Sequence, residues 1–97
     1  MAMTNGSAPL YIAAANNHLA VVQYLAQQGA DINQTDNEGY TPLMMAAGQG
    51  FLEVVQYLVR EGADTNKIVN NSITARAIAA RQGHIAVANY LRDQGVM

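Results

Sequence analysis

Two histidines are the side chains best suited to metal binding or proton transfer in this sequence. His18 and His84 could each act as a metal ligand or as a proton shuttle. They occupy equivalent places in an internal repeat and lie two repeat steps apart. At about 10 Å between packed helices, two steps are too far for one metal ion to join both imidazoles. The sequence therefore predicts no metal site.

Two aspartates recur in a short motif, Gly-Ala-Asp-x-Asn, which contains Asp31 in one place and Asp64 in another. As a catalytic pair, two carboxylates would have to lie about 5–10 Å apart in a cleft. In a turn, an aspartate instead accepts hydrogen bonds from nearby backbone N–H groups, and the motif favours this second role. The sequence also has no Ser–His–Asp order, no phosphate-binding glycine loop and no zinc signature. We therefore expect no enzyme activity and no cofactor.

The composition is that of one small folded domain. The chain has 97 residues, of which 51% are hydrophobic and 12% charged, and it contains no cysteine. A formal net charge of −2 gives no electrostatic attraction to nucleic acid or to a membrane surface. No apolar run approaches the roughly 18 residues that span a bilayer. No basic residue precedes the apolar stretch 8–15, so we expect no secretory signal and a cytoplasmic location.

An internal repeat of 33 residues organises the chain. The segment Val-Val-Gln-Tyr-Leu occurs at 21–25 and again, 33 residues later, at 54–58. Runs of this length in one register indicate duplication and not a shared bias toward alanine. The sequence predicts two full copies and a shorter third, which we call copy one (about 6–38), copy two (about 39–71) and copy three (about 72–97).

Each copy has the pattern of two short helices. In copy two, Thr41-Pro42 begins the first helix, because the missing N–H of proline is not needed in the first turn. Gly48-Gln49-Gly50 breaks this helix, and a second helix is predicted from about Leu52 to Glu61, ended by Gly62. Neither helix is long enough to be stable alone in water. The copies must therefore stack on one another.

Three motifs of copy two carry a resemblance to a known family. They are Gly39-Tyr-Thr-Pro-Leu-Met-Met-Ala-Ala47, then Gly50-Phe51, then Gly62-Ala-Asp-Thr-Asn66. They resemble the ankyrin-repeat pattern G-x-T-P-L-H-x-A-A, G-H and G-A-D-x-N, and the resemblance covers nearly all of residues 6–95. It implies an all-α solenoid of stacked helix-turn-helix units joined by hairpin-like loops, in a single domain over residues 1–97.

The resemblance also implies a function, namely non-catalytic protein binding. In this family the hairpin tips and the inner ends of the first helices line a concave groove that binds other proteins. Tyr40 is the expected anchor, because tyrosine is enriched at interface hot spots; the competing interpretation is that these positions are merely solvated loop tips. The alternative function is a structural or regulatory segment that docks on the rest of a longer chain or on a second copy of itself. The predicted protein-binding residues are Asn37, Glu38, Tyr40, Gln49, Asn70, Asn71, Ile73, Arg81 and Gln82.

Histidine positions depart from the family pattern in one respect and follow it in another. The usual histidine after Pro-Leu is replaced by Tyr11, Met44 and Ala77 in the three copies. We expect apolar packing to take the place of its hydrogen bonds. The resemblance further implies that His18 and His84 bond the backbone at the start of each second helix.

The two ends of the stack differ in polarity. Copy three carries Asn89, Arg92 and Asp93 in its second helix, as expected for a capping repeat with a polar outer face. Copy one shows no such change toward a polar outer face, so we expect part of its apolar surface to be exposed and to form a weak homodimer. The candidates for this surface are Ile12, Leu19, Val22 and Leu25, of which some must pack on copy two, so that only the remainder is exposed.

One tyrosine recurs in the second helix of each copy, at positions 24, 57 and 90. These rings could form a stacking platform for a ligand. The favoured interpretation is a ladder packed along the solenoid, with the hydroxyl groups reaching the surface.

Overall fold

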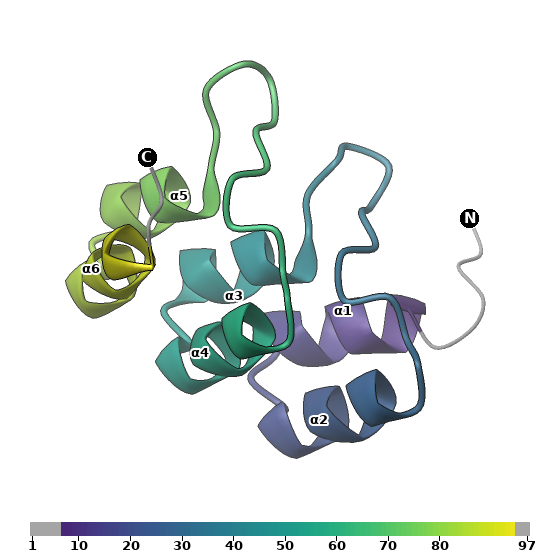
Figure 1. Ribbon diagram of the computed structural model, residues 1–97. Helices are drawn as coiled ribbons and strands as arrows, with labels where there is room; N and C mark the ends of the chain where they lie inside the picture. Colours follow the sequence, from purple (N-terminus) through teal and green to yellow (C-terminus); the bar gives the residue numbers. More distant parts are fainter. Residues whose placement is uncertain (1–6, 95–97) are drawn as a thin grey trace.

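The computed structural model describes residues 7–94, which form three helix pairs, one in each copy of the repeat (Figure 1). The prediction of an all-α repeat fold is confirmed. Within the described residues the only strand-like pairing is an isolated bridge between Val69 and Ile73. The helices are α1 (Ser7–Ala15), α2 (Leu19–Gln27), α3 (Pro42–Gln49), α4 (Leu52–Arg60), α5 (Ala75–Arg81) and α6 (Ile85–Asp93).

The helix pairs stack in two rows (Figure 1). The first helices pack in the order α1, α3, α5, and the second helices in the order α2, α4, α6. The loops between successive pairs, residues 28–41 and 61–74, project to the same side of the stack (Figure 1). None of the helices in the described part of the chain is long and apolar enough to cross a membrane.

Threonine side chains fix the start of the first helix in copies two and three. Thr41 Oγ1 accepts a 3.1 Å hydrogen bond from the backbone N–H of Met44, and Thr74 Oγ1 accepts one of 3.1 Å from Ala77. Each satisfies a backbone donor that would otherwise have no partner in the first turn. Copy three therefore keeps its helix start although Ala75 replaces the proline found at Pro42.

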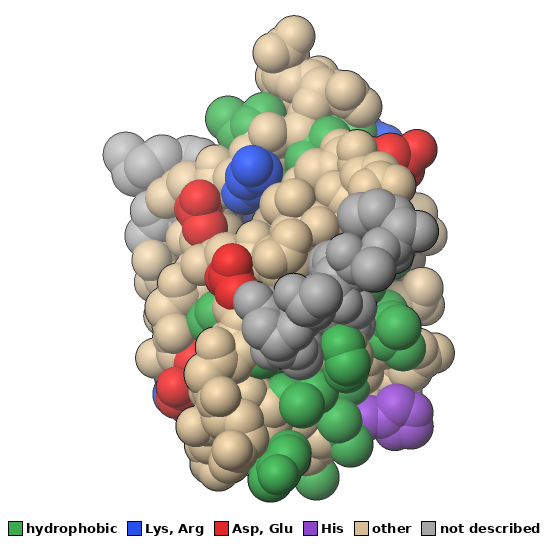
Figure 2. Space-filling view, turned by 90° about the vertical axis from the view of Figure 1, so that its right-hand side faces the viewer, with side chains coloured by type: hydrophobic (Ala, Val, Ile, Leu, Met, Phe, Trp, Pro, Cys, Tyr) green, Lys and Arg blue, Asp and Glu red, His purple; other side chains and the backbone are tan. Residues whose placement is uncertain are grey.

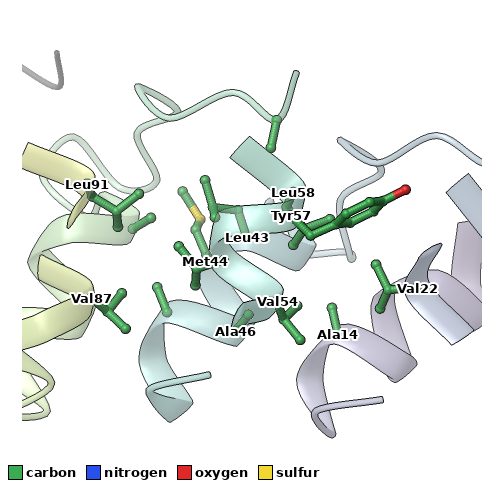
Figure 3. Close-up of a cluster of buried hydrophobic side chains, with 14 of the residues drawn as sticks. Ala14, Val22, Leu43, Met44, Ala46, Val54, Tyr57, Leu58, Val87 and Leu91 are labelled. Atoms are coloured by element: carbon green, nitrogen blue, oxygen red, sulfur yellow. The ribbon is translucent and has the colours of Figure 1, made fainter. Parts of the chain in front are cut away.

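Copy two forms the centre of the hydrophobic core (Figure 3). Its Leu43, Met44 and Leu58 are at most 1% exposed. Val22 of copy one packs on one side of this centre and Leu91 of copy three on the other (Figure 3). Buried alanines, among them 14, 46, 47 and 79, lie between the first helices and allow close packing. Stability thus depends on contacts between copies.

The amino-terminal apolar surface differs from the one predicted. Of the four candidate residues, only Ile12 is on the surface, with 58% of its area exposed. Val22 is 0% exposed, and the other two, at positions 19 and 25, pack partly against the core. Val21 and Tyr24 are exposed instead, at 47% and 61%. The reason is the 100° turn per helical residue, which puts Val21 and Val22 on different faces of α2.

Candidate functional site

A groove of about 560 Å³ lies where copy two meets copy three. Its floor is apolar and comes from α3, α5 and the loop before α5, with Met44, Met45, Ile73 and Ile78. Polar side chains from the first loop and from the ends of both helices form its rim. An apolar centre with a polar rim is the usual layout of a protein-binding surface.

Six of the nine predicted binding residues line this groove. Tyr40 is half-buried and packs against the core, so it is less exposed than expected for a free anchor. The six residues are Glu38, Tyr40, Gln49, Ile73, Arg81 and Gln82.

The three predicted asparagines lie outside the groove, on the loops. Asn70 and Asn71 have φ values of 54° and 67°, and with Ser72 they form the three-residue turn between Val69 and Ile73. The backbone N–H of Val69 donates to Ile73 at 2.8 Å, and the N–H of Ile73 donates back at 2.9 Å. Asparagine tolerates this left-handed backbone better than most residues, which explains the pair. Asn37 is exposed in the first loop.

Sequence reasoning missed the other residues of the groove. Met44 was considered only as the replacement of a family histidine, and Met45 only as a variable position of the motif. The copies differ at both positions, and that difference is a usable signal. Ile78 and Gly48 meet only when copy three packs on copy two, and the repeat pattern alone does not reveal this. The groove residues that were not predicted are Asp36, Met44, Met45, Gly48, Ile78 and His84.

Two glycines at the end of α3 let copy three approach closely. A Cβ atom at Gly48 would lie 2.8 Å from Cγ2 of Ile78, and one at Gly50 would lie 2.5 Å from Nδ1 of His84. Gly50 also has a φ of 79°, which disfavours any residue with a side chain. The Gly48-Gln49-Gly50 segment is therefore a helix end that also shapes the far end of the groove.

Asp36 shapes the loop at the near end of the groove. Its Oδ1 accepts hydrogen bonds from the backbone N–H groups of Glu38, at 2.9 Å, and Tyr40, at 3.0 Å. Its Oδ2 accepts a 2.6 Å hydrogen bond from the phenol of Tyr11. Burial alone would raise the pKa of Asp36, but these hydrogen bonds to its charged form outweigh burial and lower the pKa below its usual value. The carboxyl group is thus ionised at neutral pH.

Tyr11 corrects the expectation that apolar packing alone replaces the family histidine. In copy one the replacement is this hydrogen bond to Asp36, across to the next loop. Burial, followed by the hydrogen bond and the negative charge of Asp36, raises the pKa of Tyr11. In copy two the equivalent Met44 is 1% exposed in the apolar core, as predicted.

The histidine side chains do not act as helix caps. His18 and His84 precede α2 and α6, yet neither side chain makes a capping hydrogen bond. The prediction that they bond the backbone there is wrong. The imidazole of His84 instead lies against Gly50 and lines the groove.

The aspartates of the Gly-Ala-Asp-x-Asn motif form turns, as predicted. Asp31 Oδ1 accepts from the backbone N–H of Asn33 at 2.8 Å, and Asp64 Oδ1 accepts from that of Asn66 at 2.9 Å. Asn33 Oδ1 also accepts a 2.8 Å bond from the N–H of Asp64, which links successive loops. Across residues 7–94, no three His, Cys, Asp or Glu side chains gather in a way that could hold a metal ion.

A family model for ankyrin repeats, in three copies, matches residues 10–97. Among curated proteins no match is found. The matched range includes most of α1 and all of the helices from α2 to α6.

Proposed function

Because the chain belongs to the ankyrin-repeat family, whose members are generally protein–protein interaction modules, we propose that it binds a partner protein through the groove between copies two and three. The observation that supports this best is that the groove, of about 560 Å³, combines an apolar floor with a polar rim. Such a hollow can take up apolar side chains of a partner. The proposed role is non-catalytic, needs no cofactor and involves neither nucleic acid nor a membrane.

The charges of the groove are arranged along its length. Asp36 and Glu38 lie on the loop that precedes α3, whereas Arg81 is the last residue of α5. A helix of eight residues is about 12 Å long, so the acidic and basic groups stand at opposite ends of the floor. A fitting partner segment would place a basic residue near the loop, apolar residues over the floor and an acidic residue near Arg81.

Tyr40 remains the proposed anchor of this interaction. It stands between the acidic loop and the floor, with part of its surface free for a partner. Aromatic side chains at the centre of an interface carry much of the binding energy. Asn37, Asn70 and Asn71, on the loops above the groove, would contact only a partner that extends beyond it.

Affinity capture with matched variants tests the proposal. Arg81→Glu reverses the charge at one end of the groove, and Arg92→Glu makes the same change on α6, outside the groove. Both arginines are exposed, so both variants should melt close to the wild-type temperature. We expect Arg81→Glu to lose partners that the wild type and Arg92→Glu retain, as measured by mass spectrometry of the captured proteins. Equal capture by all three would count against the groove.

A cytoplasmic location belongs to the same proposal and is tested by cell fractionation.

A second candidate function is weak self-association through copy one. It is favoured by the exposure of Ile12, Val21 and Tyr24, at 58%, 47% and 61%. Exposed apolar side chains that lie close together tend to associate at high concentration. Sedimentation equilibrium from micromolar to millimolar protein tests it, and a strictly monomeric profile would contradict it.

A further inference from the structure

The tyrosine that recurs at positions 24, 57 and 90 is exposed to a different extent in each copy. Tyr57 of copy two is 8% exposed, and its ring points toward copy one, on the side of Val22 (Figure 3). Tyr90 of copy three is partly buried and packs on the core. Tyr24, the same residue in copy one, is 61% exposed. The position is therefore one that packs back onto a preceding copy.

The valine that recurs at positions 21, 54 and 87 shows the same difference in exposure between the copies. Val54 and Val87 are 0% and 1% exposed, whereas the equivalent Val21 is 47% exposed. Figure 3 shows Val54 directed at Ala14 and Val22, which both belong to copy one. Val21 thus has the side chain of a stacking contact, and no preceding copy covers it among the described residues.

Ile12 completes the set. Its equivalent in copy three, Ile78, packs against Gly48 of copy two and is partly buried, but Ile12 is 58% exposed. We call the surface formed by Ile12, Val21 and Tyr24 the amino-terminal face. Figure 2, which views the stack from the side of copy one, shows hydrophobic side chains gathered in the lower half of the view.

The contacts between the existing copies define what this face would fit. Copy two receives Ile78 at Gly48, where an added Cβ would lie 2.8 Å from the isoleucine. A repeat that receives Ile12 in the same way needs a residue as small at that position. It also needs small or aliphatic residues like Ala14 and Val22, which are 0% exposed between copies one and two.

A second copy of this chain does not meet these needs. At the position of Gly48 copy three has Arg81, and at the position of Val59 it has Arg92. Both arginines are exposed, and their charge and bulk close the outer face of copy three to the incoming Ile12. Of the three polar residues predicted to cap copy three, only Arg92 replaces an apolar residue of the other copies. Asn89 stands where the other copies have glutamine, and Asp93 stands where they have Gln27 and Arg60. Pairing two amino-terminal faces would set bulky side chains against bulky side chains, so it fits no better than the weak self-association at high concentration proposed above.

We propose that the amino-terminal face is a stacking site for one further ankyrin-type repeat, of the internal type found in copy two, placed ahead of α1 in the same direction as the three copies present. The contact would continue the interface that already joins copy one to copy two and copy two to copy three. This face is separate from the groove between copies two and three. The stacking proposal can therefore be right or wrong whether or not the groove binds a partner.

A longer chain tests the proposal directly. Residues 39–71 are repeated immediately ahead of Gly6, so that the added copy keeps the 33-residue spacing. We expect a single cooperative unfolding transition, because stacked repeats stabilise their neighbours, with a melting temperature raised by about 5 °C or more. Nitration of Tyr24 by tetranitromethane should fall to the low level expected for the covered Tyr57.

Two matched variants make the result specific. Gly48→Arg in the added copy reproduces Arg81 of copy three, and it should abolish the rise in melting temperature and leave Tyr24 reactive. Val21→Lys should change the melting temperature little in the original chain but lower it clearly in the longer chain, where the side chain would be covered.

Three results would overturn the proposal. The first is a longer chain that melts at the original temperature with Tyr24 still reactive, which also covers the case in which the added copy stays unfolded. The second is an equal rise in melting temperature when the added copy carries Gly48→Arg. The third is an original chain whose melting temperature rises with concentration in the micromolar range and falls on Val21→Lys, which would assign the face to a second copy.

Discussion

The phenol of Tyr11 donates a 2.6 Å hydrogen bond to Oδ2 of Asp36, which joins α1 to the loop ahead of α3. The other carboxylate oxygen holds the backbone of that loop. In the next loop Val69 occupies the position equivalent to Asp36. There, backbone hydrogen bonds between Val69 and Ile73 hold the loop in shape. At this position the two loops are therefore shaped by different interactions, and only the first loop uses an ionised side chain there.

Tyr11→Phe should lower the free energy of unfolding at neutral pH by about 1–2 kcal/mol, the usual worth of a hydrogen bond to a charged group. The folded-state pKa of Asp36 is lowered, so its contribution is present above the unfolded value of about 3.9 and is lost as the pH falls through the folded value. The difference between the two proteins should therefore shrink in acid. Urea denaturation at pH 7 and pH 2.5 measures it, and a constant difference would contradict the assignment.

The alkaline side of the same experiment gives a control. The pKa of Tyr11 is raised, by burial first and then by Asp36, so its contribution is present below the unfolded value of about 10 and is lost as the pH rises beyond it. Burial also raises the pKa of Tyr57, so both proteins should lose stability in alkali. The wild type should lose more, because the Tyr11→Phe variant has no hydroxyl group to ionise at this position.

Leu58→Ala should destabilise the chain by about 2–5 kcal/mol, through lost burial and the cavity left behind. Leu58 is 0% exposed in the central copy, and a small domain has few kcal/mol to spare. Ile85→Ala is the matched control, because Ile85 is 59% exposed and should cost at most about 0.5 kcal/mol. Guanidinium denaturation of both variants gives the comparison. Similar midpoints would contradict the central place of copy two in the core.

The sequence predicts the helices well because their signals are local. The proline-containing start at Pro42 and the glycine at Gly62 lie within a residue or two of the observed ends of α3 and α4. The groove is only partly predictable, since its floor forms when Ile78 meets Gly48 across two copies. A motif shows that copies stack, but not how deep a hollow remains between them. The Tyr11–Asp36 bond was missed because it joins α1 to a loop 25 residues further along the chain, and no local motif pairs the two residues.

Gly50→Ala should cost more stability than Gly62→Ala. Both glycines have positive φ, 79° and 95°, so both variants carry a backbone strain of about 1–2 kcal/mol. Only at Gly50 would the new Cβ meet a neighbour, with His84 Nδ1 at 2.5 Å, whereas nothing lies within 4 Å at Gly62. Combining Gly50→Ala with His84→Ala should remove the excess, as a double-mutant cycle measures it. An excess that persists without the imidazole would place the cost elsewhere.

Tyr40→Ala should weaken partner binding by about 2 kcal/mol, the scale of an aromatic hot spot. It should also lower the melting temperature, because the ring is half-buried against the core. Tyr90→Ala separates the two effects, since Tyr90 also packs partly on the core but does not line the groove. That variant should lose stability and keep its affinity, as measured by calorimetric titration well below both melting temperatures. Equal loss of affinity in both would remove Tyr40 from the binding site.

Two adjacent valines of α2 give the sharpest test of the amino-terminal face. Val22 is 0% exposed and Val21 is 47% exposed. Val22→Lys would bury a charge without a partner, and the high cost of doing so should unfold the chain. Val21→Lys should leave circular dichroism and melting temperature nearly unchanged, while it reduces self-association at millimolar concentration. Sedimentation equilibrium with the two variants decides the matter. If Val21→Lys self-associates as strongly as the wild type, some other surface of the chain mediates the contact.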